Sequence, residues 1–243
     1  MRIFRLLGAL GSLPLAPVFG LGSLVRRARV FHPVGTCWTA RVTPAEGVPP
    51  AFTEVARRLS GPARVRCSGG AWKARDAPRD ILGVAVRFGE SWTTPGDEEV
   101  DLLFATFRTL PALPFALFTS DGRDFFANTY WAVVPFRLGG ARARLRCVPA
   151  RPSPGGGDRE DILRRSVDGR PTFRIEALVA GDTVARDAVP LVDVTLAEEV
   201  PDRADLRFAP WRGARGVEPV GFVTGLRRWS YPGSQATRRL LGR

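Results

Sequence analysis

The stretch TYWAVVPFRLGGARARLRCV, residues 129–148, decides the fold class of this chain. Both halves belong to a pattern of short apolar and β-branched runs that turn residues interrupt, which is typical of β-strands. Gly139 and Gly140 lie between the halves, and a Gly-Gly pair permits the positive φ angles of a two-residue hairpin turn. The stretch therefore predicts two antiparallel strands joined by a tight turn.

Similar strand patterns occur along the chain from residue 29 onward. They are short, rich in β-branched residues and separated by turn residues, and they span residues 29–42, 62–68, 81–88, 100–107, 171–179 and 189–197. With the two strands of the hairpin they suggest an antiparallel barrel, because closing the sheet removes its exposed edges. We expect an α+β, mainly β fold, an eight-stranded antiparallel β-barrel with peripheral helices.

Helical patterns are few. FTEVARRLS (52–60) and DREDILRRS (158–166) are two candidates, the second following the flexible PSPGGG loop. A third helix is expected in the C-terminal segment, from about Phe222 to the end. No internal repeat is visible.

The length of 243 residues, the hydrophobic fraction of 44% and the charged fraction of 25% indicate one globular domain. We assign residues 27–243 to this domain and residues 1–26 to an apolar N-terminal arm. The arm begins like a signal peptide, with Arg2 and Arg5 before an apolar run, but Pro14 and Pro17 interrupt that run. We interpret it as packing on the domain or on a partner subunit of a homo-oligomer. A peripheral membrane contact or an export segment remains the alternative.

The net charge of +12 comes almost entirely from arginine, since Lys73 is the only lysine. The arginines are spread along the chain without a basic tail or stripe, which argues against nucleic-acid binding. Cys37, Cys67 and Cys147 are odd in number and far apart, which argues against a disulfide framework and a structural zinc site. Reduced thiols fit a cytoplasmic protein.

The segment RRWSYPGSQATRR (227–239) contains one of the two tyrosines of the chain. On a helix, Arg227, Tyr231, Ser234 and Arg238 share one face. A guanidinium near a phenol lowers the phenol's pKa, and a phenolate is a strong ligand for ferric iron, as in haem proteins with a tyrosine ligand. Taken alone, the pattern also fits a tyrosine that only packs its ring.

This C-terminal region resembles the haem catalases. GVEPVGFVTGLRRWSYPGSQATRR (216–239) is similar to the family's segment around its iron-ligating tyrosine, and LRFAPW (206–211) is similar to the approach to it. The resemblance implies haem b as cofactor, with Tyr231 as the metal ligand. It implies that Arg227 polarises Tyr231 and that Arg238 faces the haem carboxylates or the same network.

Three earlier segments resemble the distal half of the same family, in the family's order: RVFHPVG (29–35), VRCSG (65–69) and DAPRDILGVAVRF (76–88). The resemblance implies that His32, the only histidine, is the distal base and that Ser68 orients its imidazole. It also implies that Arg29 and Arg66 contact the haem propionates. The matched segments lie between residues 26 and 243, and residues 108–200 match only loosely.

One departure concerns the asparagine that catalases carry over the iron. The corresponding stretch here is DLLFAT (101–106), where Thr106 or Ala105 takes that place; the only asparagine, Asn128, lies in another segment. We therefore expect a haem-dependent oxidoreductase that acts on hydrogen peroxide or organic, including fatty-acid, hydroperoxides, and that is peroxidase-like rather than an efficient catalase. The alternatives are a haem carrier or sensor without turnover, or a binding protein that kept the barrel and lost the cofactor.

Overall fold

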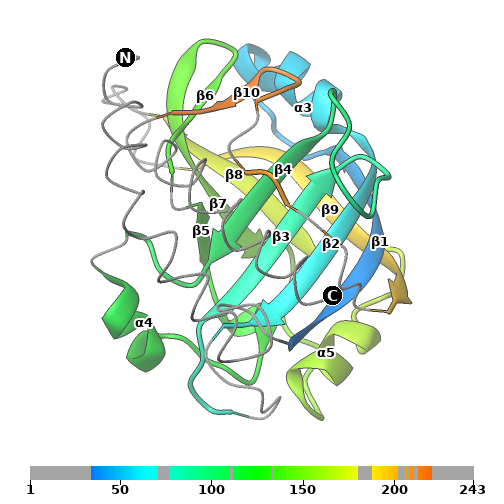
Figure 1. Ribbon diagram of the computed structural model, residues 1–243, viewed down its shortest axis with the longest axis vertical. Helices are drawn as coiled ribbons and strands as arrows, with labels where there is room; N and C mark the ends of the chain where they lie inside the picture. Colours follow the sequence, from blue (N-terminus) through cyan, green and yellow to red (C-terminus); the bar gives the residue numbers. More distant parts are fainter. Residues whose placement is uncertain are drawn as a thin grey trace, which may run out of the picture.

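The structure is a computed structural model that describes residues 34–70, 77–109, 112–132, 134–179, 188–201, 206, 208–210 and 213–220. Within these residues the chain is mainly β, as the sequence predicts, and its strands form one antiparallel sheet (Figure 1). No helix in this part of the chain is long and apolar enough to cross a lipid bilayer.

Eight strands close into a barrel. In spatial order they are β7 (Ala141–Pro149), β5 (Tyr130–Ala132), β4 (Val100–Ala105), β3 (Leu82–Phe88), β2 (Gly61–Gly69), β1 (Val34–Pro44), β9 (Val189–Val200) and β8 (Phe173–Val179). The second edge of β8 pairs with β7 over the register Ala143↔Val179 to Pro149↔Phe173, and this pairing completes the ring. The predicted fold class, an eight-stranded antiparallel barrel, is therefore confirmed.

The opening hairpin exists, with one difference. Gly139 and Gly140 have φ angles of 53° and 104°, both positive as the two-residue turn requires. The predicted strand 129–138 is split into β5 and β6 (Phe136–Leu138), which pair with different halves of β7. Pro135 lies between them and has no backbone N–H to donate, so a regular ladder cannot continue through it.

Two short elements were not predicted from the sequence. Strand β10 (Val217–Pro219) pairs with β6 and extends the sheet beyond the barrel. Helix α4 (Leu113–Thr119) follows β4, in a segment whose prolines at 111 and 114 argue against a helix. Pro114 is tolerated because it stands in the first turn, where the backbone N–H would have no helical partner.

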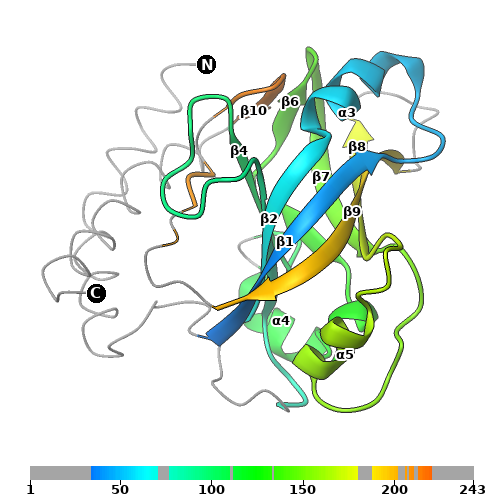
Figure 2. The ribbon, with the colours of Figure 1, turned by 90° about the vertical axis from the view of Figure 1, so that its right-hand side faces the viewer.

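The two internal helices that were predicted are present. Helix α3 (Thr53–Leu59) follows the 3₁₀ turn η1 (Pro50–Phe52), and helix α5 (Arg159–Arg165) follows the glycine loop. Asp158 caps α5 by accepting the backbone N–H groups of Glu160 and Asp161, each at 2.9 Å. Helix α3 covers one end of the barrel, and α4 and α5 lie at the other end (Figures 1 and 2).

The barrel interior is filled by apolar side chains from every strand. On β1 to β4 these are the alternate residues, and the largest that are fully buried in the molecule include Trp38, Phe88, Leu82, Leu102, Tyr130, Phe125, Phe173 and Leu145. The hydroxyl of Tyr130 donates to the carbonyl oxygen of Phe125 at 2.8 Å, in the 3₁₀ turn η3 (Phe125–Ala127), so the buried phenol is satisfied. The other residues of β1 to β4 therefore point to the outside of the barrel.

A buried ion pair on the outside of the barrel holds β3 to β4. Arg87 donates to both carboxylate oxygens of Asp101, at 2.7 and 2.9 Å, and neither side chain is exposed. The remaining donors of Arg87 reach the carbonyl oxygens of Ser91 and Thr93, at 2.9 and 3.2 Å. The pair thus fixes the loop after β3 as well as the two strands.

We predict that Asp101→Asn lowers the free energy of unfolding by roughly 3–5 kcal/mol, because it leaves the guanidinium of Arg87 buried without its counter-charge. Urea denaturation followed by circular dichroism measures this change. Glu54→Gln is the matched control, since Glu54 pairs with Arg57 and Arg58 on the exposed face of α3. A loss no larger than that of the control would contradict the structural role of the buried pair.

Candidate functional site

The outward faces of β1 to β4 carry a row of small residues. The strand register aligns Gly35 with Ser68, Ser68 with Gly83, and Gly83 with Ala105. Neighbouring strands are about 4.8 Å apart, so the row spans roughly 14 Å across four strands. With no side chain longer than that of serine, it forms a shallow floor on which a flat group could lie close to the backbone.

This outer face is shielded from solvent although it lies outside the barrel core. Ser68 and Ala105 are 5% and 7% exposed, and Gly83 is also buried. The next row along the strands, Cys37, Arg66, Ala85 and Leu103, is buried or half-buried too. Strands β2 to β4 are therefore buried on much of both faces, although their outer face also carries the charged side chains of Arg66, Arg87 and Asp101.

Arg66 brings a positive charge to this face. Its side chain is 4% exposed and lies on the outside of β2, two residues before Ser68. A Cβ atom placed on Gly35 would lie 2.9 Å from the guanidinium carbon of Arg66 and 2.6 Å from the carbonyl oxygen of Cys67. The guanidinium thus packs directly against the Gly35 backbone, and Gly35 is required there for space.

The structure separates the two positions that stand in place of the catalase asparagine. Ala105 lies in the row with Ser68, whereas Thr106 follows the end of β4. The hydroxyl of Thr106 accepts the backbone N–H of Leu82 at 3.2 Å, so it is used to end the β3–β4 ladder. Asn128 is buried in the loop before β5, where its side chain bonds to the backbone of Asp121 and Asp124.

Phe208 and Ala209 lie against the outer face of β3 and β4. The backbone N–H of Ala209 donates to Asp101 at 2.6 Å, and the guanidinium of Arg87 lies 5.3 Å from the ring centroid of Phe208. These residues belong to the stretch 206–211 that the sequence links to the tyrosine segment. One end of the outer face is therefore bounded by this stretch.

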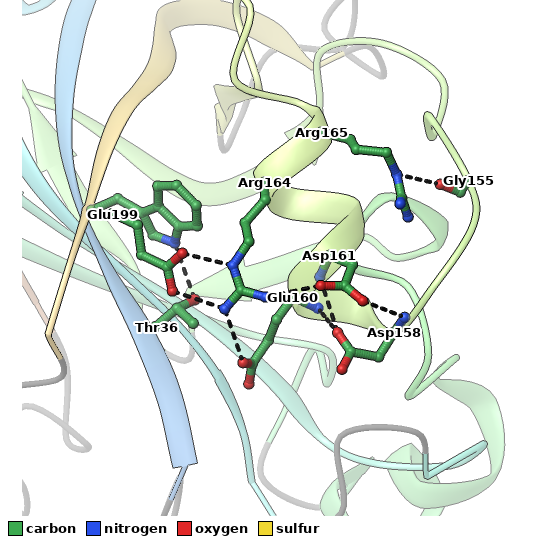
Figure 3. A network of polar contacts seen from close by, with 9 residues as sticks. Thr36, Gly155, Asp158, Glu160, Asp161, Arg164, Arg165 and Glu199 are labelled. Atoms are coloured by element: carbon green, nitrogen blue, oxygen red, sulfur yellow. Dashed lines mark hydrogen bonds and ion pairs between the residues drawn. The ribbon is translucent and has the colours of Figure 1, made fainter.

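A polar cavity of about 410 Å³ lies beside the start of β1, and Gly35 and Thr36 are among the residues that line it. Figure 3 shows its charged wall, in which Arg164 binds Glu199 through two hydrogen bonds of 2.7 and 3.1 Å and lies 3.8 Å from the carboxylate of Glu160. Glu160 is 3% exposed, and Thr36 accepts the indole N–H of Trp38 at 3.0 Å. The cavity lining suits a small hydrophilic molecule.

Two buried ion pairs in the structure were not predicted from the sequence. Besides Arg87 and Asp101, Arg159 donates to Asp80 at 3.1 Å and to the carbonyl oxygen of Gly122 at 3.0 Å, with both charged side chains buried. The signal that could have found the first pair is a charged residue inside an apolar strand. Arg87 and Asp101 each interrupt such a run.

The three cysteines are buried and form no disulfide. Burial raises the pKa of Cys67 and of Cys147, so both remain thiols at neutral pH. Both belong to the core cluster inside the barrel, on the opposite side of the sheet from Ser68 and Arg66. Neither Cys67 nor Cys147 can therefore offer a thiolate to a metal on the outer face.

Of the site residues that the sequence predicts, the structure brings together Arg66 and Ser68, on one buried face of β2, and places Thr106 beyond the end of β4. Arg29, His32, Arg227, Tyr231 and Arg238 lie outside the described residues, as do the apolar arm and the expected C-terminal helix.

The structure is similar to solved catalases. A bacterial catalase matches with a TM-score of 0.57 and 14% identity, covering 90% of this chain and 59% of that chain. Catalase A from Saccharomyces cerevisiae matches with a TM-score of 0.55 and 12% identity, covering 90% of this chain and 63% of that chain. The fold is catalase-like. No protein-family model and no curated protein matches the sequence.

Identities of 12–14% to these catalases show the fold alone. The chain also spans only about three fifths of the length of these two catalases. The chemistry of the site has to be argued from the residues of this chain.

We predict that Gly35→Ala lowers the free energy of unfolding by about 1–3 kcal/mol, because the added methyl group meets the backbone of β2 and the buried guanidinium of Arg66. Thermal denaturation followed by circular dichroism checks this. Gly96→Ala is the matched control: its added Cβ would lie 3.7 Å from the nearest atom, an ordinary contact. Equal midpoints for the two variants would show that the outer face has more room than the structure gives it.

Proposed function

We propose that this chain binds haem on the outer face of β1 to β4 and is an oxidoreductase for hydrogen peroxide or organic hydroperoxides, with peroxidase-like rather than efficient catalase activity. The observation that carries the proposal is the buried row of small residues beside Arg66 and Ser68, found in a catalase-like fold. The sequence resemblance assigns these same two residues to haem and to the distal base.

The described residues fit a flat, anionic cofactor. The row from Gly35 to Ala105 offers a floor without bulky side chains, and Leu103 adds apolar surface in the next row. Arg66 supplies a positive charge of the kind that pairs with a carboxylate such as a propionate. Haem, when bound, would supply the redox chemistry that cleaves the O–O bond, with Tyr231 as the iron ligand, polarised by Arg227.

The protein's own contribution would be proton transfer and orientation. His32 would accept a proton from one peroxide oxygen and donate one to the other, so that water leaves. The hydroxyl of Ser68 would fix the tautomer of His32 by a hydrogen bond to the imidazole. His32 stands only three positions before Gly35, so chain geometry keeps their Cα atoms within about 11 Å. Arg29 and Arg238 would hold the carboxylates of the cofactor.

The proposed preference for peroxidase-like chemistry follows from position 105. An asparagine side chain in the row with Ser68 could donate a hydrogen bond to a peroxide, whereas the methyl group of Ala105 cannot. The polar cavity that Gly35 helps to line would admit hydrogen peroxide. The apolar side chain of Leu103 is compatible with an organic hydroperoxide.

The first prediction for this function concerns the two sides of the haem. Tyr231→Phe should abolish the absorption spectrum of a tyrosinate-ligated ferric haem in protein expressed with excess haem, because it removes the iron ligand. His32→Ala should keep the spectrum and slow the reaction with hydrogen peroxide by a factor of about 10²–10⁴, the usual contribution of a general base. Stopped-flow spectroscopy measures the rate.

These measurements distinguish a haem enzyme from a haem carrier or sensor and from a binding protein without cofactor. A parent protein that binds no haem would leave the alternative of a binding protein without cofactor. Haem binding with no reaction toward peroxide would indicate a carrier or sensor. A His32→Ala variant that reacts at the parent's rate would remove His32 from the mechanism.

The second prediction concerns a variant that places an asparagine amide at position 105. Ala105→Asn should raise the rate of hydrogen peroxide dismutation on the order of tenfold, because the strand register aligns position 105 with Ser68. Oxygen release, followed with an electrode, measures it. Thr106→Asn is the matched control, since position 106 lies outside the row and its side chain serves the Leu82 backbone. A gain in Thr106→Asn alone would reverse the assignment of the two positions.

A further inference from the structure

Helix α4 exposes two large apolar side chains. Phe115 and Phe118 are 67% and 68% exposed, and they are the large hydrophobic residues that stay exposed in the described part of the chain. They are three residues apart and so lie on one side of the helix, while Ala116 is buried at 2%. Figure 1 shows α4 at the edge of the molecule, beyond the ends of the barrel strands.

The exposure of these rings is not required by the fold. A surface helix normally places polar residues on its outer side, yet residues 109–120, TLPALPFALFTS, contain no charged residue. Two exposed aromatic rings side by side on such a helix indicate a surface that is covered when the protein acts.

The charges around the helix are mainly positive. The guanidinium of Arg79 lies 5.7 Å from the ring centroid of Phe118, so a cation is held at the edge of the apolar surface. Arg108 and Arg123, both exposed, precede and follow the helix in the chain.

The acidic side chains that follow the helix accept hydrogen bonds from backbone N–H groups. The carboxylate of Asp121 accepts the backbone N–H of Arg123 at 2.8 Å, and that of Asp124 accepts the backbone N–H of Phe126 at 2.7 Å. Of these arginines, Arg79 contacts α4 itself, whereas the guanidinium of Arg108 lies 5.0 Å from the ring centroid of Trp131 on β5. The described residues that flank α4 in the chain, 106–109 and 120–124, carry two arginines and two carboxylates, so Arg79 supplies the local excess of positive charge. The whole chain carries a net charge of +12.

We propose that α4 is a docking site for an anionic membrane surface. Phe115 and Phe118 enter the boundary between headgroups and acyl chains, and Arg79, Arg108 and Arg123 contact the lipid phosphates. Apolar rings bordered by cations are the arrangement by which a short amphipathic segment binds such a surface. The proposal does not depend on haem.

The charges favour a membrane over a second copy of this chain. A two-fold contact would bring the same basic rim of both copies together, in molecules that already carry +12 each. Two phenylalanine side chains also offer far less than the roughly 800 Å² per partner of a standard protein interface. A bilayer needs no such area, and its anionic headgroups complement the arginines.

Vesicle flotation of the full chain tests the proposal. Vesicles of phosphatidylcholine with phosphatidylserine should bind it, vesicles of phosphatidylcholine alone should bind it more weakly, and added salt should weaken the binding. The double variant Phe115→Ser, Phe118→Ser should lower the partition coefficient at least about tenfold, since both apolar rings are lost. Circular dichroism should be unchanged, because both side chains are exposed.

A matched pair of variants tests how much charge near α4 contributes to vesicle binding. Arg79→Gln should weaken binding to the anionic vesicles about fivefold, as expected for one basic residue near the surface. Arg142→Gln removes the same charge from an exposed position next to the β6–β7 hairpin, away from α4, and should change binding much less.

Two results would overturn the proposal. One is a double phenylalanine variant that binds vesicles like the parent, which would assign any membrane contact to another part of the chain. The other is a double variant that turns a dimer into a monomer in sedimentation velocity while vesicle binding stays the same. That second result would make α4 a contact between copies.

Discussion

The pairing of β7 with β8 closes the sheet, and the rest of the structure depends on this closure. A closed barrel has no free edge, and it gives every strand one side inside and one outside. The inside is filled with apolar side chains and cannot hold a ligand of any size. A large cofactor would therefore lie on the outside, and among the described residues β1 to β4 carry a largely buried row of small residues that runs across four strands.

A buried ion pair holds the segment that lies against the outer face of the barrel. The Arg87–Asp101 pair ties two strands to Phe208 and Ala209 on this face, while the Arg159–Asp80 pair ties α5 to the loop before β3 at the end of the barrel, next to Gly69. Such pairs are costly to bury and more costly to break, so they specify one arrangement of the covering segments rather than adding much stability. Strands with apolar residues on both faces lack the alternation that would otherwise fix the arrangement.

The sequence was sufficient for the barrel but not for its details. Strand positions followed from short β-branched runs between turn residues, the β6–β7 turn from Gly139 and Gly140, and α5 from the helical pattern of residues 158–166 after the glycine loop, because each is a local property. Helix α4 was missed because prolines dominate its start, and β10 because a three-residue strand has no pattern of its own. The ion pairs join residues that are 14 and 79 positions apart, which no local pattern reveals. For the candidate site, Arg66 and Ser68 were found as members of a motif, and their shared buried face became visible only with the strand register.

The choice between Ala105 and Thr106 shows how register decides chemistry. The two residues are adjacent in the sequence, and a comparison of motifs alone leaves both open. Successive residues of a strand face opposite sides, so only one of the two can share a face with Ser68. The pairing of Gly83 with Ala105 makes it Ala105, and the hydroxyl of Thr106 is already engaged with the Leu82 backbone. A haem bound here as proposed would thus meet the methyl group of Ala105, which offers no hydrogen-bond donor to a peroxide.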